Sequence, residues 1–198
     1  MITFQNISEE KPFLKFREEY ERALLSKQLI IEAMCVSSYC NASKTVDSRY
    51  VNLKIVDDKE LIFFSNYNSP KSMQFNTHKK VAINIFWNTT NVQIRMKGNI
   101  KKASKKYNQK YFENRSIKKN ALAISSSQSK KIKSYELVTE KYKNVLENTN
   151  LTLCPEHWGG FIFKPFYFEF WEGHSNRLNH RVAYELSGDK WTQFYLEP

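Results

Sequence analysis

Apolar residues recur three or four positions apart in three stretches of the chain, and this spacing predicts amphipathic helices. The stretches are residues 9–28, 104–115 and 131–147. The apolar positions of the first are Phe13, Phe16, Tyr20, Ala23 and Leu24. The third carries a stripe that we interpret as a core or partner-binding face, formed by Ile132, Tyr135, Val138, Tyr142 and Val145.

Most of the remaining chain consists of short runs rich in β-branched and aromatic residues, which predict strands. We expect these strands at residues 33–39, 50–56, 61–65, 81–87, 92–101, 160–171, 178–186 and 191–196. Many short strands, few long helices and no alternating strand–helix order favour a mainly β fold, an antiparallel barrel with flanking helices. No Pro/Gly-rich linker divides the chain, so we expect one domain over residues 1–198.

Composition narrows the class of protein. The three cysteines, Cys35, Cys40 and Cys154, are an odd number without metal-ligand spacing, which argues against a disulfide framework and a zinc ribbon. No window approaches the roughly 18 consecutive apolar residues that a membrane span needs. The first residues lack the basic and apolar segments of a secretion signal. We therefore expect a soluble, cytoplasmic protein.

The charge balance points to anionic partners. The chain has 31 Lys+Arg against 20 Asp+Glu, a net charge of +11, which fits nucleic acid or anionic small molecules. Much of the excess lies between Lys101 and Lys119, where seven Lys and one Arg face a single Glu. These cations lack interleaved aromatic residues beyond Tyr107 and Tyr111. We interpret most of them as a solvated face, and nucleic-acid binding stays the least favoured alternative.

The sequence contains none of the common catalytic motifs. It has no GxGxxG, GxSxG, HExxH or P-loop, and its four histidines are not paired at helical ligand spacing. Cationic and hydrogen-bonding residues occur instead at the ends of predicted strands, a pattern that suits phosphate and heterocycle binding. They are Arg49, Lys54, Ser65, Ser69, Lys71, Gln93 and Arg95.

The run RYVNLK poses a geometric problem. Arg49 and Lys54 are five residues apart, so on a regular strand their side chains face opposite sides. For both to serve one ligand, the strand must end or bulge there, or two subunits must share the site. The residues themselves leave these possibilities open.

The C-terminal stretch resembles the signature of the pyridoxamine 5′-phosphate oxidase family, roughly WGGY, PxxxEFW, a glycine and RLHDR. Here the corresponding segments are WGGF at 158–161, PFYFEFW at 165–171, Gly173 and RLNHR at 177–181. Upstream segments resemble further family motifs in the same order. They are RYVNLK (49–54), FFSNYNSPK (63–71), VQIRMKG (92–98), YFENR (111–115) and SSSQS (125–129). The resemblance covers residues 34–198.

This resemblance implies a split β-barrel with Greek-key-like antiparallel strands, forming a homodimer with FMN at the subunit interface. It implies a C-terminal dimerisation and active-site segment at about 155–198. Gln128, Ser129, Trp171 and Arg181 are expected from the second subunit, and Ser69 and Lys71 at the FMN phosphate. The other implied FMN-binding residues are Arg49, Tyr50, Val51, Asn52, Lys54, Phe64, Ser65 and Gln93.

The resemblance also implies oxidation of pyridoxamine or pyridoxine 5′-phosphate to pyridoxal 5′-phosphate, with a hydride leaving C4′ for the flavin and O₂ reduced to H₂O₂. Arg177 is expected to be catalytic, over the pyridine ring. The expected substrate-binding residues are Lys54, Tyr111, Arg115, Lys119, Arg177 and Asn179. A related flavin oxidase acting on another ring, of the phenazine type, and a non-catalytic FMN- or pyridoxal-phosphate-binding protein are the alternatives.

The sequence departs from the family pattern in four places, one of them a pair of adjacent residues. Asn179 and His180 replace the HD pair of RLHDR, Pro70 replaces a phosphate-site arginine, and Tyr195 replaces the arginine of RLxP. Lys119 replaces a substrate-phosphate serine and supplies a charge there. If residues 177–181 form a regular strand, Arg177, Asn179 and Arg181 share one face, with Asn179 between the two arginines.

Overall fold

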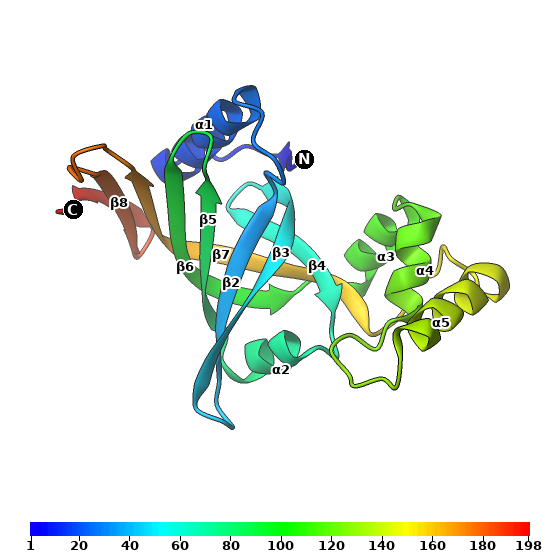
Figure 1. Ribbon diagram of the computed structural model, residues 1–198. Helices are drawn as coiled ribbons and strands as arrows, with labels where there is room; N and C mark the ends of the chain where they lie inside the picture. Colours follow the sequence, from blue (N-terminus) through cyan, green and yellow to red (C-terminus); the bar gives the residue numbers. More distant parts are fainter.

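A nine-stranded, almost entirely antiparallel sheet forms the body of the computed structural model, which describes residues 1–198 (Figure 1). Six of the strands, in the order β3-β2-β5-β6-β7-β4, close into a ring because β4 pairs with both β3 and β7. Strands β8 and β9 extend the sheet beyond β7, and β1 adds in parallel to β3. The strands are β1 (Thr3–Gln5), β2 (Ala33–Cys40), β3 (Thr45–Asp57), β4 (Glu60–Asn66), β5 (Lys80–Trp87), β6 (Val92–Lys102), β7 (Trp158–Glu172), β8 (His180–Ser187) and β9 (Lys190–Tyr195).

Five helices lie around this sheet. Figure 1 shows α1 at one side of the barrel, α2 beside the lower part of the β2–β3 hairpin, and the group α3 to α5 at the end of the molecule opposite to β8. Their bounds are α1 (Lys11–Leu25), α2 (Pro70–Thr77), α3 (Lys105–Glu113), α4 (Ile117–Ser125) and α5 (Tyr135–Asn148). None is long and apolar enough to cross a membrane.

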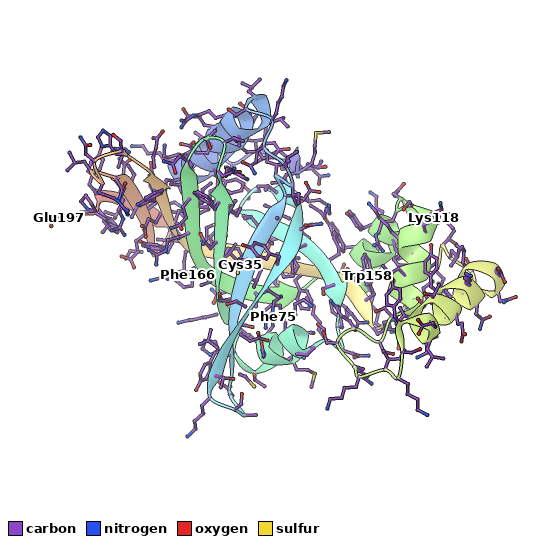
Figure 2. The ribbon with its side chains drawn as sticks, in the orientation of Figure 1. Cys35, Phe75, Lys118, Trp158, Phe166 and Glu197 are labelled. Carbon is purple, nitrogen blue, oxygen red and sulfur yellow. The ribbon has the colours of Figure 1, made fainter.

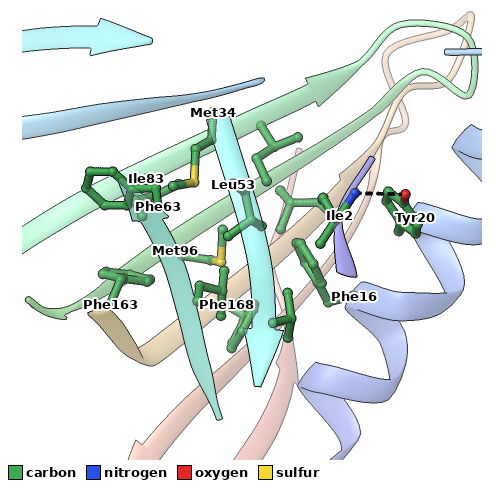
Figure 3. Close-up of a cluster of buried hydrophobic side chains, with 14 of the residues drawn as sticks. Ile2, Phe16, Tyr20, Met34, Leu53, Phe63, Ile83, Met96, Phe163 and Phe168 are labelled. Carbon is green, nitrogen blue, oxygen red and sulfur yellow. Dashed lines mark hydrogen bonds between the residues drawn. The ribbon is translucent and has the colours of Figure 1, made fainter. Parts of the chain in front are cut away.

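The core lies inside the ring and beneath α1. Alternate residues of β5 are buried, as the period of a strand requires when one face packs inward. The buried stripe of α1 includes Phe16 and Tyr20, which contact the sheet as the apolar spacing predicts, and the hydroxyl of Tyr20 accepts a hydrogen bond from the amide of Ile2 (Figure 3). Trp87 lies under this helix with its ring centroid 6.0 Å from that of Phe16.

Truncating Trp87 is expected to lower the free energy of unfolding by about 3–5 kcal/mol. The side chain is 1 % exposed, and its Nε1 donates to the carbonyl of Ile31 at 3.0 Å, so Trp87→Ala leaves a cavity and an unpaired acceptor. Urea unfolding followed by circular dichroism measures the loss. The control is Tyr135→Ala, which removes a 78 % exposed aromatic side chain and should cost within about 0.5 kcal/mol. Equal losses in the two variants would contradict this packing.

Each predicted strand and the three predicted helices are present, with ends shifted by a few residues. The sequence did not predict β1, α2 or α4, because each is short and lacks a clear apolar period. The interpretation of the stripe at 132–145 as a core face is wrong within this chain, since α5 buries none of its residues. This helix packs on α4 at the outside of the molecule.

Candidate active site

A cavity of about 720 Å³ lies between the sheet and the helical group α3 to α5. It is lined by parts of β3 and β4, the beginning of α2, the α3–α4 junction and residues 128–129. Five of its lining side chains are cationic against the single acid Asp47, so the cavity suits an anionic ligand. The five cations are Arg49, Lys54, Lys71, Arg115 and Lys119.

A bulge in β3 brings Arg49 and Lys54 to the same cavity. Leu53 pairs with Phe63 and Ile55 pairs with Ile62, so Lys54 is the extra residue between two consecutive pairs. A bulge shifts the side-chain alternation by one position. Both cations line the cavity despite their odd spacing, and so do Tyr50, Val51 and Asn52 between them. The ammonium group of Lys54 also contacts the carboxylate of Glu32 at 3.1 Å.

The guanidinium group of Arg49 is held rigidly at the cavity wall. It donates to the hydroxyl of Ser38 at 2.6 Å, to the amide oxygen of Gln74 at 3.0 Å and to the carbonyl of Val36 at 3.2 Å. Asp47 forms an ion pair with it at 2.5 Å. These contacts orient the guanidinium before any ligand arrives, which lowers the entropic cost of binding.

The first turn of α2 has the features of a phosphate site. Ser69, the residue before the helix, donates its hydroxyl to the carbonyl of Asn66 and caps none of the helical amides. The hydroxyl of Ser72, in the same turn, is fully buried without a partner. The amides of Ser72 and Met73 already donate to the carbonyl of Ser69, so the N–H of Lys71 and the positive end of the helix dipole are what this turn offers an anion. The residues present therefore fit a phosphate group, although Pro70 supplies neither a cation nor an N–H.

Lys71 adds a buried cation to this turn. Its residue is 5 % exposed, and its Nζ donates to the hydroxyl of Ser69 at 3.1 Å. Burial and the nearby charge of Arg49 lower the pKa of Lys71 to about 8. An anion bound beside it would restore the missing countercharge and raise this pKa again.

Helix α3 packs very closely on the start of β7, and glycine makes this possible. A Cβ atom on Gly159 would lie 2.2 Å from Nδ2 of Asn108 and 2.3 Å from the hydroxyl of Tyr67. Asn108 instead accepts from the amide of Gly160 at 2.8 Å and donates to Tyr67 at 2.9 Å. The glycine pair of WGGF therefore fixes the helix that carries Tyr111.

Aromatic rings and one arginine form the second end of the cavity. The rings of Phe64 and Tyr111 are stacked with centroids 3.6 Å apart, and Phe64 also stacks on Trp158 at 5.2 Å. The guanidinium of Arg115 lies 4.3 Å from the Trp158 ring centroid and donates to Asn120 at 3.2 Å. Burial lowers the pKa of Arg115 and raises that of Tyr111. Figure 2 shows Trp158 at the junction of the sheet and the helices.

Gln128 and Ser129 line the cavity of their own chain. The amide oxygen of Gln128 accepts a hydrogen bond from the hydroxyl of Ser65 at 3.2 Å. The prediction that Gln128 and Ser129 reach the site from a second subunit is therefore corrected. The reason is that the segment after α4 folds back over the end of β4, a long-range contact without a local sequence signal.

Three predicted flavin-binding residues lie elsewhere, in one row across β6, β7 and β8. Gln93 pairs with Trp171, and Trp171 pairs with Arg181, so the three stand side by side on the sheet. None of them lines the cavity. Strand β8 lies at the end of the molecule opposite to α3 to α5, so this row is far from Arg115 of the same chain (Figure 1).

The expected strand face of Arg177, Asn179 and Arg181 is wrong, because β8 begins only at His180. Arg177 lies in an exposed turn with φ +65°, and Asn179 accepts a hydrogen bond from the amide of His174 at 3.1 Å. Neither lines the cavity. The asparagine thus stabilises the turn, where a regular strand would have placed it between two arginines.

The cavity unites thirteen of the predicted site residues. Besides the cations and aromatic residues already described, it includes Tyr50, Val51 and Asn52 of β3. Ser69 does not line it but contacts Lys71. The sequence did not predict four of the lining residues, which are Trp158, Asp47, Asn114 and Ser116. The motif WGGF, which begins with Trp158, was a signal for the first of them.

The lysine-rich stretch at 101–119 is divided among different roles. Arg115 and Lys119 line the cavity. Lys101 and Lys105 form ion pairs with Glu60 and Glu156. Four of the eight cations in this stretch therefore have individual roles, two in the cavity and two in ion pairs.

Two family models match the chain. The model described as pyridoxamine 5′-phosphate oxidase matches residues 22–149, and the model described as pyridoxine 5′-phosphate oxidase C-terminal dimerisation region matches residues 158–198. Among solved structures, PhzG from Burkholderia lata, in complex with tetrahydrophenazine-1-carboxylic acid, has a TM-score of 0.87 at 23% identity and covers 94% of this chain and 92% of that chain. A pyridoxamine 5′-phosphate oxidase-related, FMN binding protein from Nostoc punctiforme has a TM-score of 0.75 at 13% identity, covering 92% and 97%. These likenesses confirm the split-barrel fold.

Curated relatives are more similar in sequence. The pyridoxine/pyridoxamine 5′-phosphate oxidase of Leptospira interrogans is 32% identical over 94% of this chain and 88% of the relative. Those of Cytophaga hutchinsonii and Colwellia psychrerythraea are 35% and 36% identical, covering 94% and 92% of this chain and 88% and 85% of the relatives. With this identity over nearly its whole length and a family model matched across the cavity, the chain belongs to the pyridoxamine 5′-phosphate oxidase family.

Proposed function

We propose that this protein is an FMN-dependent oxidase that converts pyridoxamine 5′-phosphate or pyridoxine 5′-phosphate to pyridoxal 5′-phosphate. The observation that carries the proposal is a single cavity with cationic side chains at two ends and stacked aromatic rings at the second of them. Arg49, Lys71 and the first turn of α2 form one end, and Arg115 and Lys119 form the other. Two phosphate-bearing aromatic molecules, a flavin nucleotide and a vitamin phosphate, match this arrangement.

In this proposal the α2 turn and Lys71 hold the FMN phosphate, and Arg49 binds next to it. Ser65 and Gln128 border the flavin, joined by their own hydrogen bond. When bound, FMN would supply the two-electron acceptor for oxidation at C4′ of the substrate, with O₂ as the final oxidant and H₂O₂ as its product. The amine substrate becomes an imine by this oxidation, and water hydrolyses the imine to the aldehyde and ammonia, whereas the alcohol substrate gives the aldehyde directly.

The substrate phosphate lies at Arg115, Lys119, Lys54 and the hydroxyl of Tyr111. Arg115 provides a planar fork for two phosphate oxygens, whereas the lysines supply point charges. Stacking of Phe64, Tyr111 and Trp158 fixes the wall behind them. The protein therefore contributes mainly by aligning C4′ of the substrate with the flavin. Holding two reactants in the correct geometry accelerates a bimolecular reaction.

A second copy of the chain completes the site. Trp171 and Arg181 lie in the segment that matches the family's C-terminal dimerisation region, and Gln93 pairs with Trp171. Because the row lies far from the cavity of its own chain, we assign it, together with Arg177 and Asn179, to the cavity of a partner in a homodimer. Arg177 is the proposed catalytic residue, which positions the substrate ring and assists proton removal. The exposed aromatic side chains Tyr50 and Phe86, 77 % and 53 % exposed, fit such an interface.

The test mixes purified protein, FMN and pyridoxamine 5′-phosphate in air and follows aldehyde and peroxide. We expect one peroxide for each aldehyde formed, and slower turnover in Arg177→Ala. Protein that binds FMN and turns yellow but forms no product would favour the two alternatives, oxidation of a different ring substrate of the phenazine type or a non-catalytic binding role. Protein that neither binds FMN nor turns over would overturn the proposal, and unchanged turnover in Arg177→Ala would refute the role of that residue.

A further inference from the structure

Glu169 is a charged side chain buried in the sheet, outside the cavity. It lies in the middle of β7 and is 2 % exposed. A carboxylate removed from water is stable only where cations and hydrogen-bond donors replace its hydration. One of the partners that do so here, Arg181, belongs to the row of residues assigned to the cavity of the second subunit.

Both oxygens of Glu169 are fully used. Oε1 accepts from Nε and Nη2 of Arg181 at 3.0 and 2.7 Å. Oε2 accepts from Nη1 of Arg95 at 3.0 Å and from the hydroxyl of Tyr167 at 3.1 Å. Because two guanidinium groups face one carboxylate, the cluster keeps an excess charge of about +1 at neutral pH.

The register of the sheet explains why Arg181 can reach this carboxylate. Ala183 is the residue opposite Glu169 on β8, and Trp171 is opposite Arg181. Arg181 is thus the diagonal neighbour of Glu169 on the same face, a separation that long side chains span. Ala183 has only a methyl group at the intervening position, so the arginine side chain lies across it toward Glu169.

The contacts of Arg181 leave part of its guanidinium group free. Nη1 donates to the carbonyl of Glu197 at 2.6 Å, in addition to the two bonds to Glu169. A guanidinium has five N–H donors, so three are occupied and two have no protein acceptor. The buried carboxylate therefore fixes the direction of a guanidinium group with two free donors, at the strand position opposite Trp171.

We infer that Glu169 is a positioning residue for flavin binding: it holds Arg181 beside Trp171 so that the two free N–H donors meet the polar edge of the flavin. The inference rests on the proposed function, in which Arg181 and Trp171 contact FMN. Arg95 and Tyr167 bind the second oxygen and keep the carboxylate in place, without contacting the ligand. A pre-oriented arginine loses less side-chain entropy when FMN binds, which strengthens binding without a further contact.

The test is a double-variant cycle on the FMN dissociation constant, measured by quenching of flavin fluorescence. Glu169→Gln should weaken FMN binding about tenfold, because a neutral amide does not fix both donors of Arg181. In an Arg181→Ala background, adding Glu169→Gln should change the constant less than about twofold. Glu185→Gln, the matched control, removes the same charge from an exposed position of β8 and should leave the FMN constant within about twofold of wild type.

Melting temperatures of the same variants show whether Glu169→Gln destabilises the fold as a whole. Such general damage would weaken FMN binding by the same factor with and without Arg181. If Glu169→Gln does not fold, Glu169→Gln with Arg95→Gln replaces it, since this pair removes one charge of each sign. Wild-type protein that binds no FMN overturns the proposed function and this inference together. Wild-type binding with an unchanged constant in the Glu169 variant, or an equal loss with and without Arg181, overturns the positioning role alone.

Discussion

Replacing Arg115 by alanine is expected to lower kcat/KM for pyridoxamine 5′-phosphate by roughly a hundredfold, or about 3 kcal/mol. The guanidinium lies over Trp158 and is restrained by Asn120, so it is oriented in a partly dehydrated place where a charged hydrogen bond to phosphate is strong. Alanine leaves that phosphate without its fork. Steady-state rates of aldehyde formation over a range of substrate concentrations measure the change.

Two controls make this prediction specific. Lys118→Ala removes the same charge from the neighbouring helix α4, but Lys118 is exposed and does not line the cavity, so its kcat/KM should stay near wild type (Figure 2). Unphosphorylated pyridoxamine, at high concentration, should be oxidised equally slowly by wild type and Arg115→Ala. A similar loss for both substrates would show that Arg115 acts on something other than the phosphate.

The affinity for FMN is expected to fall as the pH rises above about 8, by up to tenfold for each pH unit. Burial lowers the pKa of free Lys71 to about 8, and a bound phosphate raises it again by supplying the opposite charge. Below pH 8 the lysine is already charged in both states, so binding takes up no proton. Between pH 8 and the higher pKa of the complex, binding requires proton uptake, and each pH unit makes it less favourable.

Fluorescence titrations of FMN between pH 7 and 9.5 test this dependence. Phosphate itself is dianionic throughout this range, because its second pKa is about 6. Riboflavin, which has the same ring without phosphate, is the ligand control and should show no such slope. Lys71→Met should weaken FMN binding at pH 7 and remove the slope, whereas Lys80→Met, at an exposed position, should do neither. A flat affinity from pH 7 to 9.5 in the wild type would exclude Lys71 from the phosphate site.

The free energy of unfolding of the ligand-free protein should depend on pH through Lys71 as well, and it should increase with pH where the affinity for FMN decreases. The folded-state pKa of Lys71 lies below its usual value of 10.5, so in the absence of ligand its protonated form is disfavoured by folding. The associated cost is present below about pH 8 and decreases as the pH rises toward 10.5. The charged form of Lys71 thus lowers the free energy of unfolding of the ligand-free protein, and the same charge strengthens binding of a phosphate. Such perturbed groups are common in binding sites.

Much of the fold followed from local patterns. The run of β-branched and aromatic residues at 81–87 predicted β5, and the helical spacing of Phe13, Phe16 and Tyr20 predicted α1 and the face it buries. These patterns indicate which side of an element faces the core, because apolar side chains recur on the buried side once per helical turn or at every second strand residue. The short α2 was missed because its first turn serves a polar site and only Phe75 gives it an apolar anchor.

The sequence by itself therefore determined the strands, the main helices, the cationic side chains and the motifs that place the chain in its family. Only the tertiary structure decided which of them meet. The bulge at Lys54, the placement of Gln128 beside Ser65, and the separation of Arg181 from the cavity of its own chain all depend on pairing between distant segments. Such pairing is set by the whole core at once, because a shift of one residue in register turns every side chain to the other face.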